Sequence, residues 1–271
     1  FVHARCAFIG YDILFPPALS QGLRECEIPT VAVQERTIQA FARNYNIMID
    51  HYIVPDEQCK EAWEGKPFSD IRHMYIGGHW RLESEAKPVP DWKDFILVVD
   101  YHAELVSRWN TLTNWDNYCR FYEDLLELAN RCLGFQFVVR TKEFMLDRVN
   151  PELLARLREC GNIKWDLSRV LNRSYRLLRS CRIIFGRHTS LMDEALALGI
   201  PAVVHENFCH SLPYLENVSA EYAANFDISS SVNEAEKLVR MRMSERSRPV
   251  NPESQIKATL QEILKDCPPR L

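Results

Sequence analysis

The stretch that decides the fold is residues 183–206, which reads IIFGRHTSLMDEALALGIPAVVHE. Ile183–Phe185 is a short apolar run of strand-forming residues, and Ala202–Val204 is a second one. Between them, Leu191, Ala195 and Leu198 recur at helical spacing. The stretch therefore predicts a strand, a helix and a second strand that is parallel to the first.

The turn before this helix contains groups that could bind an anion. Gly186 permits a sharp turn, and Thr189 or Ser190 can cap the helix, with Asp193 placed three residues after Ser190 as in a capping box. Gly199 ends the helix. A helix N-terminus offers free N–H groups and the positive end of a dipole to an anion. An ordinary strand–helix–strand unit without a ligand fits these residues equally well.

The composition is that of a globular protein. The chain has 271 residues, of which 46% are hydrophobic and 26% are charged, and its net charge is -4. This charge gives no support to a role in binding nucleic acid. No apolar run approaches the roughly 18–20 residues that a membrane span needs. Because the chain begins at Phe1 without Met, we expect residues upstream of it.

The nine cysteines do not form a recognisable site. Their number is odd, and none forms a C-x-x-C pair. A disulfide scaffold or a zinc centre would show regular spacing. The cysteines therefore indicate reduced thiols in a cytoplasmic protein, and we expect no metal.

Strand-like and helix-like segments alternate along the whole chain. In the first ninety residues we expect strands at 6–10, 28–33, 47–54 and 73–76 and helices at 18–25, 37–44 and 55–64. A polar, proline-containing segment, Ser84–Trp92, is the candidate linker. After it we expect strands at 95–99, 135–139, 163–165, 183–185 and 202–204, and helices at 115–132, 151–159, 168–180, 190–198, 231–243 and 252–265.

This order predicts an α/β fold with two Rossmann-like, doubly wound parallel-sheet halves that face a central cleft. The predicted domains are residues 1–90, the N-terminal half, which we expect to be truncated, and residues 91–250, followed by a C-terminal helix at 251–271. Ligands of such sheets bind at the carboxyl ends of the strands, so polar residues there are candidates.

Cationic candidates in the second half are Arg140, Lys142 and His188. Arg140 and Lys142 lie two apart, so on an extended segment both side chains point the same way and could clamp a diphosphate. Pairing with Glu143 or Asp147 at the surface is the alternative. His188 could donate to a phosphate or could be a structural cap.

Carboxylates at strand ends could act in proton transfer. Asp100 and His102 could be a base and its orienting partner, or Asp100 could be the base or nucleophile, or only a cap. Glu35 is the candidate base of the first half, and Arg36 could lower its pKa or merely pair with it. Asp12 is a further carboxylate at a strand end.

Three segments carry a resemblance to GT-B glycosyltransferases. TSLMDEALALGIPAVVHE resembles the donor-binding segment of that family, EIPTVAVQER is similar to a segment of bacterial capsule, teichoic-acid and Kdo transferases, and GGHWR looks like their G-x-x-R element. The resemblance implies that Thr189 and Ser190 bind the donor phosphates and that Glu194 binds the ribose. Glu35 stands where those transferases have a histidine.

The resemblance implies a glycosyltransferase that moves a sugar from a nucleotide-activated donor to a polysaccharide or lipid-linked acceptor. The donor is then the substrate, with no cofactor and no metal, and CMP-, UDP- and CDP-linked sugars stay open. Such an enzyme would be cytoplasmic, with peripheral membrane association at the inner face as an option. Residues expected to line the cleft or touch the sugar are Asp12, His79, Arg81, His205 and Glu206.

Two other functions stay open. UDP-N-acetylglucosamine 2-epimerases and glycerophosphotransferases share the same architecture, and a nucleotide-sugar 2-epimerase would need several acidic residues converging on one sugar. A catalytically inactive module that only binds a nucleotide is the third hypothesis, because the QER segment at residues 34–36 lacks the histidine of the transferases.

Overall fold

The computed structural model describes residues 4–10, 12, 15–42, 45–83, 94–100, 115–141, 146–170, 172–207, 218–245 and 255–267. The chain divides into two compact units. Unit 1 consists of Phe1–Ser84 together with Pro252–Leu271, and unit 2 consists of Glu85–Asn251. Among the described helices, none is both long enough and apolar enough to cross a membrane.

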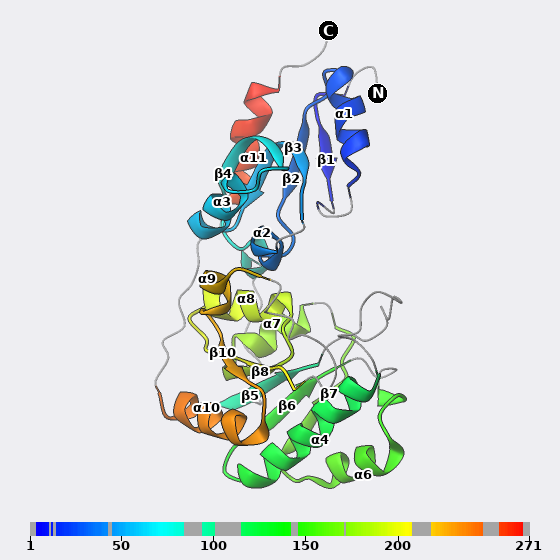
Figure 1. The fold of residues 1–271 in the computed structure, drawn as a ribbon, viewed down its shortest axis with the longest axis vertical. Helices are drawn as coiled ribbons and strands as arrows, with labels where there is room; N and C mark the ends of the chain where they lie inside the picture. The colour runs from blue at the N-terminus through cyan, green and yellow to red at the C-terminus, as the bar shows by residue number, and fades with distance from the viewer. Residues whose placement is uncertain are drawn as a thin grey trace. The chain divides into compact units, whose positions relative to one another are not determined.

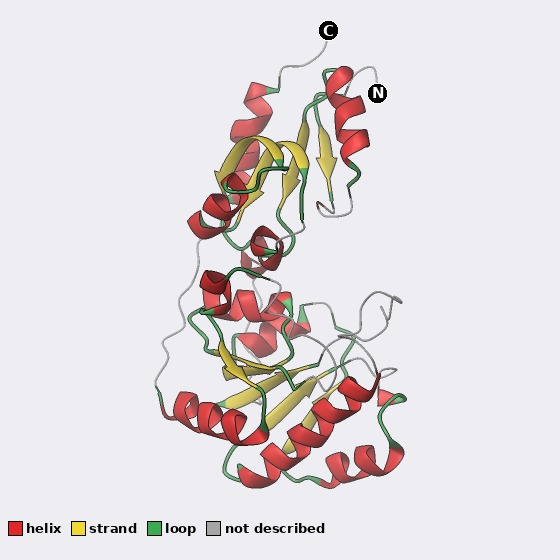
Figure 2. Ribbon diagram, in the orientation of Figure 1, coloured by secondary structure: helices red, strands yellow, loops and turns green. Residues whose placement is uncertain are grey.

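Unit 1 is a four-stranded parallel sheet with helices on both faces (Figures 1 and 2). Its strands lie in the order in which they occur in the chain: β1 (Ala7–Ile9), β2 (Thr30–Val33), β3 (Met48–Val54) and β4 (Asp70–Ile76). The connecting helices are α1 (Pro17–Glu25), α2 (Ile38–Phe41) and α3 (Glu57–Glu64). A 3-10 helix, η2 (Trp80–Glu83), follows β4, and α11 (Ile256–Asp266) joins the unit from the far end of the chain.

Alternate residues of the central strands of unit 1 face different helices. Ala32, Tyr52 and Val54 pack with residues of α2 and α3 in one buried cluster. Val31 and Ile53, one position away, pack against Ile256, Ile263 and Cys267 of the α11 segment in another. Successive side chains of a strand point to opposite faces. It follows that α11 covers the face that the connecting helices leave open.

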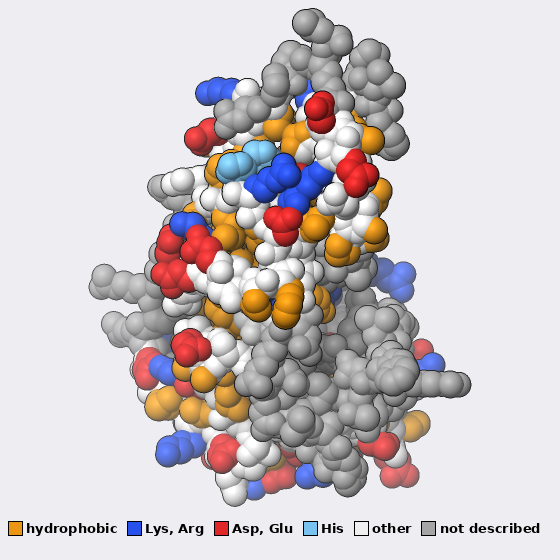
Figure 3. Space-filling view, turned by 45° about the horizontal axis from the view of Figure 1, so that its top comes forward, with side chains coloured by type: hydrophobic (Ala, Val, Ile, Leu, Met, Phe, Trp, Pro, Cys, Tyr) orange, Lys and Arg blue, Asp and Glu red, His pale blue; other side chains and the backbone are white. Residues whose placement is uncertain are grey.

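Salt bridges connect β3 and β4 of unit 1 to α1. Arg24 of α1 pairs with Asp50 of β3 at 2.7 Å and also with Asp70 of β4. Arg72 of β4 approaches Asp50 at 3.3 Å. Figure 3 shows basic side chains next to acidic ones in this way on the face that it presents. Each arginine of these pairs lies next to a carboxylate, so its charge is balanced locally.

Unit 2 is a six-stranded parallel sheet in the order β10-β9-β8-β5-β6-β7. The strands are β5 (Phe95–Val99), β6 (Phe137–Arg140), β7 (Ile163–Asp166), β8 (Cys181–Gly186), β9 (Ala202–His205) and β10 (Asp227–Ser229). The chain moves outward from β5 to β7, then returns to the other side of β5 with β8. A crevice forms at such a reversal in doubly wound sheets, so β5 and β8 mark the place where a ligand is expected.

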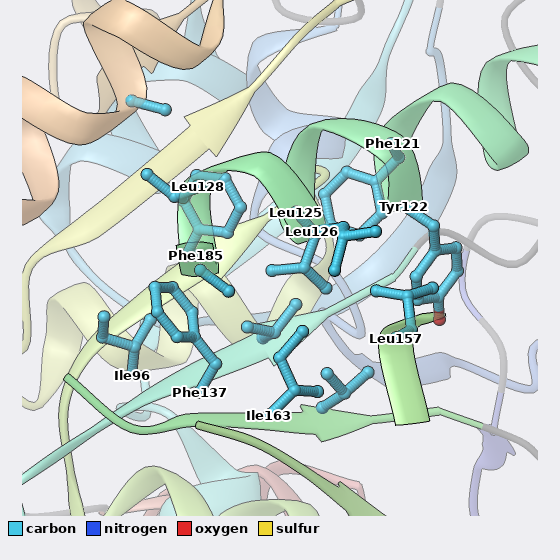
Figure 4. Packing of buried hydrophobic residues seen from close by; sticks show 14 of the residues in the cluster. Ile96, Phe121, Tyr122, Leu125, Leu126, Leu128, Phe137, Leu157, Ile163 and Phe185 are labelled. Carbon is cyan, nitrogen blue, oxygen red and sulfur yellow. The ribbon is translucent and has the colours of Figure 1, made fainter. Parts of the chain in front are cut away.

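Helices cover both faces of the sheet of unit 2 (Figure 1). One face carries α4 (Trp115–Arg131), α6 (Pro151–Glu159) and α10 (Val232–Ser244), and the other carries α7 (Arg173–Leu178) and α8 (Ser190–Ala197). A short helix, α9 (Ala220–Ala223), precedes β10. Figure 4 shows Phe121 and Leu125 of α4 packed over Phe137 and Phe185 of the strands. Burial of these large apolar side chains is the main stabilising term for the unit.

The predicted α/β class with two parallel-sheet halves is confirmed, and the strand order reverses, as in a doubly wound sheet, in unit 2. One helix was predicted wrongly. The helix expected over 168–180 begins only at Arg173, because Asn172 has a left-handed φ of 62° and because the Asp166 carboxylate accepts the Ser168 N–H. The linker candidate Ser84–Trp92 lies outside the described residues.

Candidate functional site

At the centre of the sheet of unit 2, Gly186 brings the loop after β8 against β5. Its φ is 145°, and a Cβ atom there would lie 1.9 Å from the carbonyl oxygen of Val99. The Arg187 N–H donates to that same oxygen at 3.3 Å. Only glycine allows this approach, so Gly186 fixes the path of the chain into residues 187–189.

The helix that follows, α8, begins with Thr189 at its N-cap position, but the predicted capping box does not form. Thr189 makes no side-chain cap, and its Oγ1 is buried without a hydrogen-bond partner among the described residues. Asp193 instead accepts a hydrogen bond from the Tyr222 hydroxyl of α9. The side chain of the N-cap residue therefore satisfies none of the first N–H groups of α8.

His188 and Glu194 are both buried beside tyrosines. His188 Nε2 lies 2.9 Å from the Tyr222 hydroxyl oxygen and 3.6 Å from Asp193 Oδ1. Glu194 Oε1 accepts from the Tyr175 hydroxyl of α7 at 3.4 Å. The structure thus groups His188, Thr189, Ser190 and Glu194 around the start of α8, while the roles expected of them stay predictions.

Asp100, at the carboxyl end of β5, is an acceptor for three hydroxyl groups. Its Oδ2 accepts from Tyr118 at 2.6 Å, Tyr122 at 2.8 Å and Thr141 at 2.5 Å. Burial raises the pKa of Asp100 above its usual value, although these hydroxyls favour its charged form. No motif in the sequence singled out the two tyrosines. They recur four residues apart on α4, the spacing of one helix face.

A buried polar chain connects α4, β9, β10 and the loop after β8. His205 contacts Ser229 Oγ through Nδ1 and Asp124 Oδ2 through Nε2, both at 2.9 Å. Asn207 donates to Asp124 at 2.6 Å and accepts from Arg187 at 3.1 Å. We call these five residues the Asp124 network. It encloses His205, which was predicted to touch the sugar, and Glu206 beside it is 5% exposed.

Arg140 is held by a carboxylate that differs from the ones considered from the sequence. Its Nη1 donates to Asp166 Oδ1 at 3.2 Å and to the Ser168 carbonyl at 2.6 Å. Arg173 binds the other oxygen of Asp166 at 2.7 Å. One carboxylate between two guanidinium groups leaves this group with a net positive charge. Lys142 and His102 lie outside the described residues.

Unit 1 has its own group of polar residues at the carboxyl edge of its sheet. Asp12, which is 1% exposed, accepts from the Tyr52 hydroxyl at 2.5 Å and from the Glu35 N–H at 3.3 Å. Arg81 Nη2 lies 2.7 Å from Glu35 Oε1. The structure therefore brings together three residues that were predicted separately from three strand ends. Arg36, the expected partner of Glu35, is replaced in that role by Arg81.

Gln34 and Trp63, which were not predicted to act at the site, fix the segment that carries Glu35. The Gln34 amide donates to the carbonyls of Arg36 and Thr37 at 3.0 and 3.3 Å, and its oxygen accepts from Trp63 Nε1 at 3.1 Å.

His79 lies on the same edge, with Nε2 at 3.8 Å from Asp56 Oδ2. In the described parts of both units, no group of three or more His, Cys, Asp or Glu residues could hold a metal ion.

Comparison with known proteins shows similarity at the level of structure. No family model matches the chain, and no curated protein matches it. Among solved structures, UDP-GlcNAc 2-epimerase from Methanocaldococcus jannaschii, solved with UDP-GlcNAc and UDP, is similar with a TM-score of 0.63 at 14% identity, over 96% of this chain and 75% of that one.

A second similar structure is UDP-GlcNAc 2-epimerase from Neisseria meningitidis, bound to UDP-GlcNAc. Its TM-score is 0.58 at 16% identity, and the match covers 96% of this chain and 76% of that one. At such low identity the likeness shows the fold alone. The chain therefore has the two-sheet α/β architecture of GT-B-like proteins.

Proposed function

We propose that this chain is an enzyme that acts on a nucleotide-activated sugar and inverts one stereocentre of that sugar, as a 2-epimerase does. The candidate nucleotide-binding residues lie in unit 2, and the candidate acid–base residues lie in unit 1. The observation that carries the proposal is the pair of carboxylates at the carboxyl edge of unit 1, in which Asp12 accepts the N–H of Glu35.

Two carboxylates suit this chemistry because an epimerase must take a proton from one face of a ring carbon and return one to the other face. Two positioned acid–base groups can divide these tasks. Arg81 Nη2, at 2.7 Å from Glu35 Oε1, fixes the position of that carboxylate. The similarity to two enzymes whose substrate is UDP-GlcNAc supports the same assignment.

The nucleotide is assigned to unit 2 because its sheet reverses direction between β5 and β8. Gly186 lets the loop after β8 pass close to β5 there, and the Thr189 side chain does not cap the N–H groups at the start of α8. A phosphate satisfies such groups and benefits from the helix dipole. Glu194, in the same helix, is the candidate acceptor for ribose hydroxyls.

The experiment that tests the reaction is incubation of nucleotide sugars with the chain in D2O without an acceptor, followed by proton NMR. An epimerase yields the isomer with deuterium at the inverted carbon, and Glu35→Gln should abolish it. Free sugar without an isomer would instead indicate a transferase that leaks hydrolysis product. If neither the isomer nor free sugar forms, the chain is a module that only binds the nucleotide sugar.

Nucleotide binding is tested separately by thermal shift with CMP, CDP, UMP, UDP, GDP and dTDP. A ligand at 100 times its dissociation constant stabilises the folded state by about 2.7 kcal/mol. We expect one nucleotide to raise the midpoint of the wild type and not that of Glu194→Ala. A shift that survives in Glu194→Ala would remove this residue from the site.

Glycosyl transfer is the second candidate, and one observation favours it. The contact with Arg81 positions the Glu35 carboxylate at the edge of the sheet, and one positioned carboxylate is what an inverting transferase needs to deprotonate an acceptor hydroxyl. In that case the NMR experiment gives no isomer, and donor consumption depends on an added glycan or lipid-linked acceptor.

A further inference from the structure

We propose that Trp80, Arg81 and Glu35 of unit 1 form a binding subsite for a neutral pyranose ring, with the ring stacked on the Trp80 indole. We call this group the Trp80 shelf. The inference deepens the proposed function, on which it rests for the expectation that the bound sugar is the one attached to the nucleotide.

Trp80 is a large aromatic side chain held in place at the surface. It is 42% exposed, whereas Trp63 of the same unit is 1% exposed. The guanidinium carbon of Arg81 lies 5.2 Å from the centre of the Trp80 ring, so a cation–π contact orients the indole. An oriented, exposed aromatic face is suited to the apolar C–H face of a sugar ring, because contact removes apolar surface from water on both sides.

Hydrogen-bonding groups for sugar hydroxyls are next to this ring. Arg81 Nη2 lies 2.7 Å from Glu35 Oε1, so the residue that contacts the indole also binds the carboxylate. Glu35 Oε2 is removed from solvent and has no hydrogen-bond partner among the described residues. The side chains of Glu35 and Arg81 are each 18% exposed, so a sugar hydroxyl next to the indole can reach their accessible atoms, although it cannot reach this buried oxygen.

The backbone that carries the shelf is rigid before any ligand arrives. A Cβ atom at Gly77 would lie 2.3 Å from Ile53 Cγ2, and Gly78 has a φ of 78°. The Gly77 carbonyl accepts from the Gln255 N–H at 2.9 Å. Leu82 of η2 is 3% exposed, and its N–H bonds the His79 carbonyl at 2.9 Å. A preformed site loses little conformational entropy on binding.

The charges around the shelf select the class of sugar. Glu35 and the buried Asp12 are acidic, and Arg81 is already paired with Glu35. An acidic sugar would bring its carboxylate next to these groups and would be repelled. Neutral hexoses and acetamido hexoses carry no charge that these groups would repel, and their hydroxyls can bind the accessible atoms of Glu35 and Arg81. The shelf therefore favours a neutral sugar over Kdo or a sialic acid.

The test follows each tryptophan by fluorine NMR in protein labelled with 5-fluorotryptophan. The chain has six tryptophans, and the resonance that disappears in Trp80→Phe belongs to Trp80. Methyl glycosides of N-acetylglucosamine, of glucose and of N-acetylneuraminic acid are titrated separately. We expect the two neutral glycosides to shift the Trp80 resonance saturably, with dissociation constants on the order of 10 mM, and the acidic one to have no effect.

Variants distinguish a loss of stacking on the Trp80 indole from a loss of folding. Trp80→Ala should weaken the neutral glycoside at least about tenfold, while Trp80→Phe, which keeps an aromatic face, should lose less. Glu35→Gln should also weaken it, and its melting temperature shows whether it is folded. Phe68→Ala is the matched control, because Phe68 is 81% exposed in the same unit but precedes β4. It should bind like the wild type.

The outcomes distinguish this inference from the proposed function. A Trp80 resonance that no glycoside shifts, equal effects of neutral and acidic glycosides, or unchanged binding by folded Trp80→Ala would each overturn the shelf. If a nucleotide binds in the thermal-shift panel while no glycoside binds, the shelf fails and nucleotide binding stands. If neutral glycosides bind at Trp80 while no nucleotide sugar is bound or converted, the shelf stands and the proposed function fails.

Discussion

Gly186 shows how one residue can decide whether the centre of unit 2 forms. We expect Gly186→Ala to destabilise unit 2 by more than about 3 kcal/mol, because the new methyl group would meet the Val99 carbonyl at 1.9 Å and because φ is 145°. Urea unfolding measures this loss. The matched control is Gly134→Ala, which meets nothing within 4 Å and should change stability by less than about 1 kcal/mol. Equal losses in both would contradict the proposed close approach.

Asp100 is a second single residue whose substitution should change the stability of unit 2 measurably. Because its pKa is raised in the folded state, the folded chain binds the proton more tightly than the unfolded chain does. Its contribution to stability is therefore greatest at low pH and falls as pH rises from about 4 through the raised pKa. We expect Asp100→Asn, whose amide oxygen can still accept from the hydroxyls, to melt at a higher temperature at pH 7 than the wild type.

Melting temperatures of both proteins between pH 4 and pH 8 provide the measurement. The curves should converge toward the acid end, where the wild-type carboxyl is protonated. A variant that is less stable at pH 7, with a gap that does not narrow in acid, would show that the charge of Asp100 stabilises the fold.

Among the structural elements, α4 is coupled to the loop after β8 through the Asp124 network. Removing the carboxylate leaves the fully buried His205 and Asn207 without their acceptor. We expect Asp124→Ala to cost about 3 kcal/mol in unfolding experiments. Glu123→Ala is the control, because Glu123 is exposed on the same helix and should cost less than about 0.5 kcal/mol.

The same substitution has a predicted pH dependence. Burial opposes ionisation of Asp124, but the hydrogen bond and charge of His205 outweigh it and lower its pKa. The stabilisation is then complete above the unfolded pKa of about 3.9 and is lost as pH falls through the lower folded value. The gap between wild type and Asp124→Ala should therefore shrink only below about pH 4. A gap that closes already near pH 6 would contradict this account.

These elements also show which parts of the fold could be predicted from the sequence and which could not. The central strands are continuous apolar runs, so the strand at 95–99 could be predicted to the residue. The start of α7 could not, because it depends on the left-handed Asn172 and on a carboxylate from β7. Strand ends correctly located Asp12, Glu35 and Asp100 at sheet edges. The Asp124 network was missed, because its members come from separate elements and meet only in the folded chain.

For the molecule as a whole, the contact between α11 and β2–β3 connects distant parts of the chain. Ile263 is fully buried against Val31 and Ile53, whereas the adjacent Leu264 is 42% exposed. We expect Ile263→Ala to destabilise unit 1 by about 3 kcal/mol and Leu264→Ala by less than about 1 kcal/mol. Hydrogen exchange should report the loss in β2 and β3 and leave β5 and β8 protected. A loss of equal size in both units would mean that they unfold as one.

This contact also sets the order of events during synthesis on the ribosome. Domains usually fold as they emerge, with the N-terminal one first. Here Val31 and Ile53 appear early, but the helix that covers them comes from residues 256–266. All of unit 2 is translated in between. The half that is made first therefore has an uncovered apolar sheet face until the last helix is made, and unit 2 can complete its fold before unit 1 does.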